Sequence, residues 1–220
     1  MFVRPEDMGL FVTFEGIEGS GKTTQIRKAA DYLKEEGIPC VMTGEPGGTP
    51  LGGELRKILL DKTALELSGR TELLLFAADR AQHVEEVIAP AMGKGEVVLC
   101  DRFSDATIAY QGYGRGQDLG HIRSLCTFAS RSLAPDMTFL FDISADTGLD
   151  RITDRASRAG DAPREDRFER ERLKFHEMVR DGYLTLAREE PDRFRVIDAS
   201  RDIDAVHRNV RIHLKGLIER

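Results

Sequence analysis

The chain has 220 residues, of which 40% are hydrophobic and 32% are charged, with a formal net charge of -6. This length and apolar content suit a single domain over residues 1–220. The acidic balance argues against a nucleic-acid-binding surface, so no nucleic acid polymer is expected as a partner. Residues 1–9 lack an apolar signal segment, and no apolar run approaches the roughly 20 residues of a membrane span. We therefore expect a cytoplasmic protein with no membrane partner.

Short apolar segments alternate with longer amphipathic segments along the chain. The apolar segments predict strands at residues 10–14, 38–43, 97–100, 138–141 and 195–197. The amphipathic segments predict helices at residues 23–36, 50–60, 71–90, 119–133, 168–188 and 203–219. Continuous apolar strands separated by helices are typical of an α/β fold with a parallel sheet covered on both faces. Ligands of such sheets bind beyond the carboxyl ends of the strands.

A glycine-rich motif, G-x-x-x-x-G-K-T, follows the first predicted strand and begins the first predicted helix. Its residues are Gly16, Ile17, Glu18, Gly19, Ser20, Gly21, Lys22, Thr23 and Thr24. This order of strand, loop and helix surrounds a polyphosphate with backbone N–H groups and the positive end of the helix dipole. Lys22 is expected to reach the β- and γ-phosphates, and the Thr23 hydroxyl to ligate Mg²⁺. The motif predicts a binding site for a nucleoside triphosphate.

Polar residues end two of the other predicted strands. Asp101 at the end of the third strand can hold Mg²⁺ directly or through water, and Arg102 beside it can neutralise a phosphate. The alternative is that Asp101 and Arg102 form an ion pair that ends the strand and binds no ligand. The sequence Glu-Pro-Gly-Gly-Thr at residues 45–49 predicts a tight turn, which would display Glu45 at the rim of the sheet.

Two pairs of residues have both a functional and a structural interpretation. Phe76 and Arg80 are four residues apart and share one face of a predicted helix, where a ring and a guanidinium can contact a base. A core phenylalanine with a solvent-facing arginine is the ordinary alternative. Tyr110 and Gln111 could close over a sugar or base, or simply belong to a helix that ends in glycine.

A polar segment at residues 156–165 contains glycine and proline and separates two helical patterns, as surface loops do. Arginines are dense around it, at positions 151, 155, 158, 164 and 167. This density favours a short arginine-rich lid, over about residues 151–168, that closes on phosphate groups. An ordinary loop between helices is the alternative. The histidines are scattered without metal-ligand spacing, and we expect them to lie at the surface or to be partly paired.

Taken together, these motifs resemble those of bacterial thymidylate kinases, which are P-loop nucleoside monophosphate kinases. The matching segments, in order, are FEGIEGSGKTT at 14–24, EPGGT at 45–49, FAADR at 76–80, DR at 101–102, AYQG at 109–112 and DRFE at 166–169. They extend over nearly the whole chain, and the set is far more specific than the glycine-rich loop alone. The resemblance implies a three-layer, P-loop NTPase-like fold with a five-stranded parallel sheet, helices on both faces and a short lid.

The resemblance also implies a reaction, the transfer of the γ-phosphoryl group of ATP to dTMP, giving dTDP and ADP. It further implies Mg²⁺ as a cofactor and a homodimer as the assembly. By this likeness Phe76 would stack on thymine and Arg80 would hydrogen-bond the edge of the base. Tyr110 would pack under the deoxyribose, with Gln111 beside it.

The remaining implied roles concern the phosphates. Arg102 would grip the phosphate of dTMP, Glu18 would lie near the substrate sugar and phosphate, and Glu45 would lie near the acceptor phosphate. The glycine-rich loop contains no arginine, so the resemblance assigns the catalytic arginine to the lid, with Arg155 and Arg158 as first choices.

Two alternative functions belong to different classes. A deoxynucleoside kinase, or another nucleotide kinase on the same scaffold, would share the glycine-rich loop. A nucleoside acceptor carries no phosphate, so a deoxynucleoside kinase would have less need of an arginine that binds one. A GTPase-like switch would bind nucleotide for signalling. The sequence has no N-K-x-D-like motif for reading guanine, and the arginine-rich segment suits phosphoryl transfer better.

Overall fold

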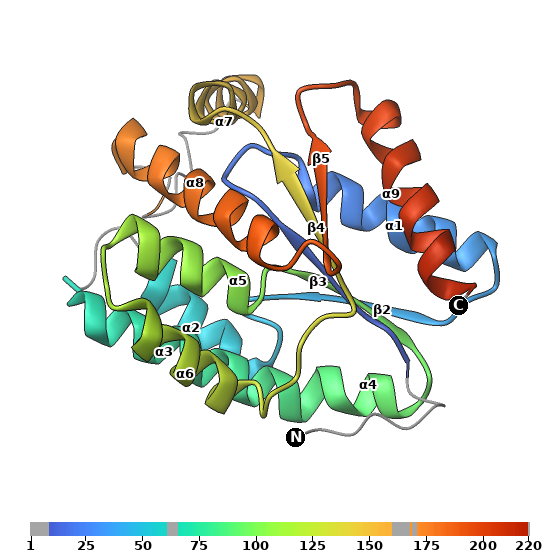
Figure 1. Ribbon diagram of the computed structural model, residues 1–220, viewed down its shortest axis with the longest axis horizontal. Helices are drawn as coiled ribbons and strands as arrows, with labels where there is room; N and C mark the ends of the chain where they lie inside the picture. Colours follow the sequence, from blue (N-terminus) through green and yellow to red (C-terminus); the bar gives the residue numbers. More distant parts are fainter. Residues whose placement is uncertain (1–8, 61–65, 160–167, 169–170, 220) are drawn as a thin grey trace.

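The computed structural model describes residues 9–60, 66–159, 168 and 171–219, with the backbone alone for 155–159. Five strands form one sheet (Figure 1). They are β1 (Phe11–Glu15), β2 (Cys40–Gly44), β3 (Val97–Asp101), β4 (Met137–Asp142) and β5 (Phe194–Asp198). All neighbouring strands are parallel, in the order β2-β3-β1-β4-β5. The predicted five-stranded parallel sheet is confirmed, with small differences at the strand ends.

Helices cover both faces of the sheet, which gives the predicted three layers (Figure 1). They are α1 (Lys22–Glu35), α2 (Pro50–Leu60), α3 (Gly69–His83), α4 (Ala89–Gly93), α5 (Ser104–Thr107), α6 (Leu119–Ala129), α7 (Ala145–Ala159), α8 (Leu173–Glu189) and α9 (Ile203–Ile218), with π-helical segments η1 (Val84–Ile88) and η2 (Ile108–Gly114). Helices α1 and α9 pack together beside the strands, and α8 contacts β4, β5 and η2. None of the described helices is long and apolar enough to span a membrane.

Several helix boundaries differ from the predicted ones. The helix predicted at 71–90 begins earlier, because Ser68 caps it by accepting a hydrogen bond from the Thr71 N–H, and it continues through η1 into α4. The helix predicted at 119–133 stops at Ala129, since Arg131 and Ser132 have φ of 53° and 63°. Such left-handed backbone ends a right-handed helix.

The segment predicted to be a polar loop is in part helical. Helix α7 extends to Ala159, so the prediction of a loop is wrong for residues 156–159. The helix buries Ile152 and exposes Thr153 and Asp154, which is the amphipathic pattern of a surface helix. Residues 160–167 of the predicted lid lie outside the described residues.

The apolar core between the sheet and its helices is centred on phenylalanines from adjacent strands. Phe14 of β1 stacks on Phe141 of β4 with ring centroids 5.9 Å apart and lies 5.4 Å from Phe139. The aliphatic side chains of Leu33 in α1 and Leu214 in α9 are also fully buried in this cluster. Burial of these side chains holds β1 rigidly in the middle of the sheet, and the glycine-rich loop starts where β1 ends.

A buried ionic network fixes the segment that follows β3. Arg193 donates to both carboxylate oxygens of Asp105, at 2.7 Å and 3.0 Å, and to the Thr138 hydroxyl at 2.6 Å. The Thr138 hydroxyl in turn lies 2.7 Å from that of Thr13. The Arg193 and Asp105 side chains are 13% and 6% exposed. The network joins α5 to β4, β1 and the residue before β5.

We predict that Arg193→Met lowers the free energy of unfolding by about 3–5 kcal/mol, because it leaves the Asp105 carboxylate buried and unpaired. Urea denaturation would measure this loss. The matched control is Arg123→Met, which removes an exposed ion pair with Glu189 and should cost at most about 1 kcal/mol. Equal losses in the two variants would contradict a structural role for the buried network.

Candidate active site

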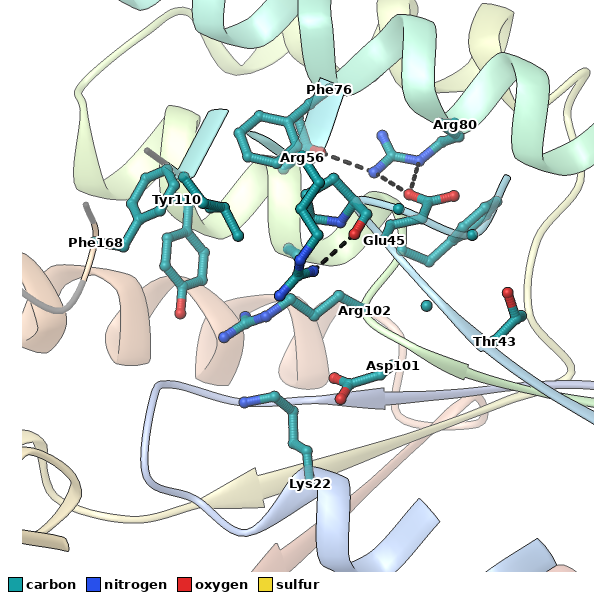
Figure 2. Close-up of a pocket in the computed structure, with 18 of the residues that line it drawn as sticks. Lys22, Thr43, Glu45, Arg56, Phe76, Arg80, Asp101, Arg102, Tyr110 and Phe168 are labelled. Atoms are coloured by element: carbon teal, nitrogen blue, oxygen red, sulfur yellow. Dashed lines mark hydrogen bonds and ion pairs between the residues drawn. The ribbon is translucent and has the colours of Figure 1, made fainter. Parts of the chain in front are cut away.

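A cavity of about 660 Å³ opens beyond the carboxyl ends of β1, β2 and β3 (Figure 2). Most of the predicted site residues contribute to its wall, although they come from distant segments of the chain. The lining residues include Glu18, Gly19, Lys22, Thr23, Glu45, Arg56, Phe76, Arg80, Asp101, Arg102, Tyr110, Gln111 and Phe168. The parallel sheet brings these residues together because its carboxyl strand ends share one edge.

The glycine-rich loop wraps tightly between β1 and α1. Gly19 has φ +73°, and a Cβ atom there would lie 2.1 Å from the carbonyl oxygen of Gly148 in α7, so a side chain would not fit. The Lys22 ammonium donates to the carbonyl oxygens of Gly16 and Ile17, at 2.8 Å each. Burial, with Arg102 nearby, lowers the pKa of Lys22 to about 8. Ser20 and Gly21 complete the loop, and Thr24 lies exposed in the first turn of α1.

Two oxygen atoms meet where the loop faces the end of β3. The Thr23 hydroxyl donates to Asp101 Oδ2 at 3.4 Å. Among the described residues no group of three or more His, Cys, Asp and Glu side chains could hold a metal. A hydroxyl and a carboxylate oxygen are ligands of the kind that Mg²⁺ takes, alongside water and phosphate oxygens.

The side chain of Arg102 is held from three sides. Its Nη2 donates to Glu18 Oε1 at 2.9 Å, and its Nη1 donates to the Tyr183 hydroxyl at 3.2 Å. The guanidinium also lies over the Tyr110 ring, 4.8 Å from the centroid. The side chain remains 19% exposed and points into the cavity (Figure 2). A cation fixed in this way can receive an anion without reorganising.

Glu18 contacts three side chains. Its carboxylate accepts from Arg102 and from the Tyr110 hydroxyl, at 2.9 Å and 2.5 Å, and lies 3.3 Å from His176 Nδ1. Burial alone would raise the pKa of Glu18, but Arg102, His176, Lys22 and Tyr110 lower it to about 2. Glu18 is therefore a carboxylate throughout the physiological pH range.

Glu45 does not lie at the rim, so that prediction is wrong. Its carboxylate is 3% exposed and accepts from Arg80, with Oε2 2.8 Å from Nη2 and 3.0 Å from Nε. The other oxygen, Oε1, lies 3.0 Å from His83 Nδ1. Arg80 also donates to the Thr107 hydroxyl at 2.9 Å and is almost fully buried, so it is not the solvent-facing arginine of the structural alternative. The turn points inward because Glu45 compensates a buried guanidinium.

Aromatic rings form one side of the cavity. The ring of Phe76 lies 6.1 Å from that of Phe168, and Tyr110 meets Phe168 edge-on at 5.5 Å. Figure 2 shows Phe76 near Arg80, as their shared helix face predicts. The Gln111 amide is directed to Glu72, to which it donates at 2.8 Å. The wall therefore combines apolar ring faces with a few fixed polar groups, as small-molecule sites do.

Residues that were not predicted from the sequence also shape this site. Arg56 of α2 donates to the carbonyl oxygen of Pro46 at 2.7 Å, and its guanidinium points into the cavity (Figure 2). Glu15, His176 and Tyr183 are buried behind Arg102 and Glu18. Of the histidines expected at the surface or partly paired, His83 and His176 belong to the second kind: both are buried, beside Glu45 and Glu18 respectively. His176 and Tyr183 are seven residues apart on α8, a spacing that could have placed them on one inward face.

The structure does not describe the side chains of the arginines that were predicted to be catalytic. Arg155 and Arg158 fall within α7, but their side chains lie outside the described residues, as do Arg164 and Arg167 entirely. Arg151 of the same helix donates to the carbonyl oxygen of Ala199 at 3.0 Å, near the glycine-rich loop.

Known proteins that are similar to this chain belong to one family. The family model for thymidylate kinase matches residues 14–210. The thymidylate kinase of Syntrophus aciditrophicus is 54% identical over 210 residues, which cover 96% of each chain. That of Desulfovibrio desulfuricans is 52% identical over 211 residues, covering 96% of this chain and 97% of the relative.

A solved structure is similar over almost its whole length. The crystal structure of thymidylate kinase from Ehrlichia chaffeensis has a TM-score of 0.76 and 37% identity, covering 94% of this chain and 99% of that chain. The sequence resemblance is thus confirmed at the level of both sequence and fold. The chain belongs to the thymidylate kinase family and is a dTMP kinase, a phosphotransferase that uses ATP.

Proposed function

We propose that the cavity binds dTMP and that Arg102 holds its phosphate opposite the γ-phosphate of ATP. The placement of the Arg102 guanidinium carries this proposal. It points into the cavity, held by Glu18 and Tyr183, on the side of Lys22 and Asp101, which belong to the proposed triphosphate site (Figure 2). Arg56 supplies a second guanidinium to the same cavity. Two cations beside an aromatic wall suit a nucleoside monophosphate.

The base and sugar are proposed to occupy the aromatic side of the cavity. Phe76 stacks on thymine, and Arg80, oriented by Glu45, donates to the edge of the base. Tyr110 packs under the deoxyribose, because its hydroxyl is held by Glu18 and its ring lies beside Phe168. Gln111 supports this wall through its hydrogen bond to Glu72. Glu45 thus acts by holding Arg80.

The triphosphate of ATP is proposed to lie in the loop of residues 16–24. Loop N–H groups surround the phosphates, and Lys22 contacts the β- and γ-phosphates. Thr23 and Asp101 would hold Mg²⁺, which neutralises phosphate charge when bound. The cytoplasm, which contains both ATP and dTMP, is the proposed location.

The reaction requires positioning and neutralisation of charge, without a covalent intermediate on the protein. The transferred phosphoryl group passes through a loose transition state in which negative charge spreads over its oxygens. Lys22 and Arg102 fix the donor and acceptor phosphates in line, which provides most of the entropic advantage. Arg155 and Arg158 are proposed to add positive charge at the transition state and, with the lid, to exclude water that would compete as acceptor.

The test of function compares dTMP, thymidine, dUMP and CMP as acceptors with ATP. We expect dTMP to have the highest kcat/KM, because the arginines grip a phosphate and the ring wall fits thymine. Strong turnover of thymidine without turnover of dTMP would support the deoxynucleoside kinase instead. ATP hydrolysis that no acceptor accelerates would support the nucleotide switch.

We predict that Lys22→Ala lowers kcat by about 10²-fold or more, because it removes a cation from the transferred phosphate. A coupled assay of ADP release would measure this effect, and circular dichroism would show a retained fold. Lys28→Ala, which removes an ion pair with Asp204 on the outer side of α1, is the matched control. Normal turnover in Lys22→Ala would refute the assignment of the loop.

We predict that Arg155→Ala and Arg158→Ala lower kcat more than they raise the KM for dTMP. An arginine that acts on the transition state contributes little to ground-state binding. Steady-state kinetics with dTMP as the varied substrate would measure both constants, with Arg188→Ala in α8 as the control. Full kcat in both lid variants would exclude this role for the lid.

A homodimer is proposed to form through α2, α3 and α6. These helices are adjacent in Figure 1 and carry exposed apolar side chains. The exposed residues are Leu51 (50%), Ile58 (38%), Leu74 (53%) and Phe128 (82%). Apolar side chains gathered on neighbouring helices are typical of a surface that another subunit covers.

We predict that Phe128→Asp converts the dimer into monomers, because it places a charge at the proposed apolar interface. Sedimentation velocity at micromolar concentration would measure the change. Ile212→Asp is the control, since Ile212 is 67% exposed but lies on α9, across the sheet. A monomeric unmodified protein, or equal behaviour of the two variants, would contradict the interface.

A further inference from the structure

The backbone of Arg102 has an unfavourable conformation that the surrounding structure must hold. Its φ is +70°, in the left-handed region that an L residue seldom adopts. The N–H of Arg102 donates to the carbonyl oxygen of Phe14 at 3.1 Å. The next N–H, that of Phe103, donates to Glu15 Oε1 at 2.7 Å. The carboxylate of Glu15 therefore fixes the backbone immediately after Arg102.

The second oxygen of the same carboxylate reaches the side chain of Arg102 through one intermediary. The Tyr183 hydroxyl donates to Glu15 Oε2 at 2.7 Å and accepts from Arg102 Nη1 at 3.2 Å. Glu15 and Tyr183 are both fully buried. The Tyr183 hydroxyl has one hydrogen to donate, so its bond to Glu15 turns a lone pair toward Arg102. One buried carboxylate thus fixes both the backbone and the guanidinium of this residue.

We propose that Glu15 is a positioning residue for Arg102 and that Tyr183 extends its hold to the guanidinium. This inference rests on the proposed role of Arg102 in binding the acceptor phosphate. Glu15 ends β1 and directly precedes Gly16. The residue directly before the ATP loop therefore also orients the arginine for dTMP, and this shared residue fixes the two phosphate sites relative to each other.

The environment of Glu15 supports a functional reason for its presence. Burial and the nearby Asp105 carboxylate raise the pKa of Glu15, and Arg102, the Tyr183 hydroxyl and the Phe103 N–H oppose that rise by stabilising the carboxylate. A buried carboxyl group is unfavourable for folding unless its partners compensate for the lost hydration. Buried groups of this kind, with specific charged partners beside a cleft, are frequent at functional sites.

The test separates positioning from general stability by using Tyr183→Phe and Glu15→Gln, which preserve the ring and the approximate side-chain volume. We expect each to raise the KM for dTMP by about tenfold, as for the loss of a hydrogen bond to a charged group, and to leave the KM for ATP unchanged. Tyr32→Phe, at a buried tyrosine of α1 outside the cavity, is the matched control and should change neither constant. If Glu15→Gln fails to fold, Tyr183→Phe decides the result alone.

A double-mutant cycle with Arg102→Met then shows whether the effect passes through Arg102. In that background Tyr183→Phe should raise the KM for dTMP no further, because the side chain that it positions is absent. An equal increase in both backgrounds, or a normal KM for dTMP in Tyr183→Phe alone, would overturn the inference. An unchanged KM in Arg102→Met itself would instead refute the proposed role of Arg102, and this inference with it.

Discussion

The ion pair between Arg102 and Glu18 is the interaction on which the arrangement of the site depends. It joins the end of β3 to the loop that follows β1, across a distance of 2.9 Å between Nη2 and Oε1. The pair remains charged in the physiological range, because the cations and donors around Glu18 lower its pKa to about 2. It also fixes Tyr110, whose hydroxyl donates to the same Glu18 oxygen. The proposed acceptor phosphate, sugar and triphosphate sites therefore share one electrostatic anchor.

The fold supplies the rigidity that this anchor needs. Strands β1 and β3 are adjacent and parallel, so their carboxyl ends place Glu15 and Arg102 at the same edge of the sheet. The pair formed by Arg193 and Asp105 then holds the segment after β3 from the other side. Desolvated charges contribute to a site only when their positions are fixed, because mobile partners lose in entropy what they gain in attraction.

The sequence permitted prediction of the fold and of most residues in the cavity wall, but not of their mutual contacts. Alternating apolar and amphipathic segments determine a parallel sheet, and short motifs such as those at residues 16–24 locate its ligand edge. Glu45 shows the limit of this reasoning, since its inward direction depends on Arg80 and His83, which are more than thirty residues away. The end of helix α7, residues 156–159, was predicted as a loop because its sequence is polar and runs into a segment that contains glycine and proline.

Titration calorimetry tests the central claim most directly. It would measure the affinity of dTMP and of thymidine for the unmodified protein and for Arg102→Met. The two ligands differ only in the phosphate, so the comparison isolates the group that Arg102 is proposed to hold. The account predicts that Arg102→Met weakens dTMP binding by about 30-fold or more and leaves thymidine binding nearly unchanged. An equal loss for both ligands, or no loss for dTMP, would contradict it.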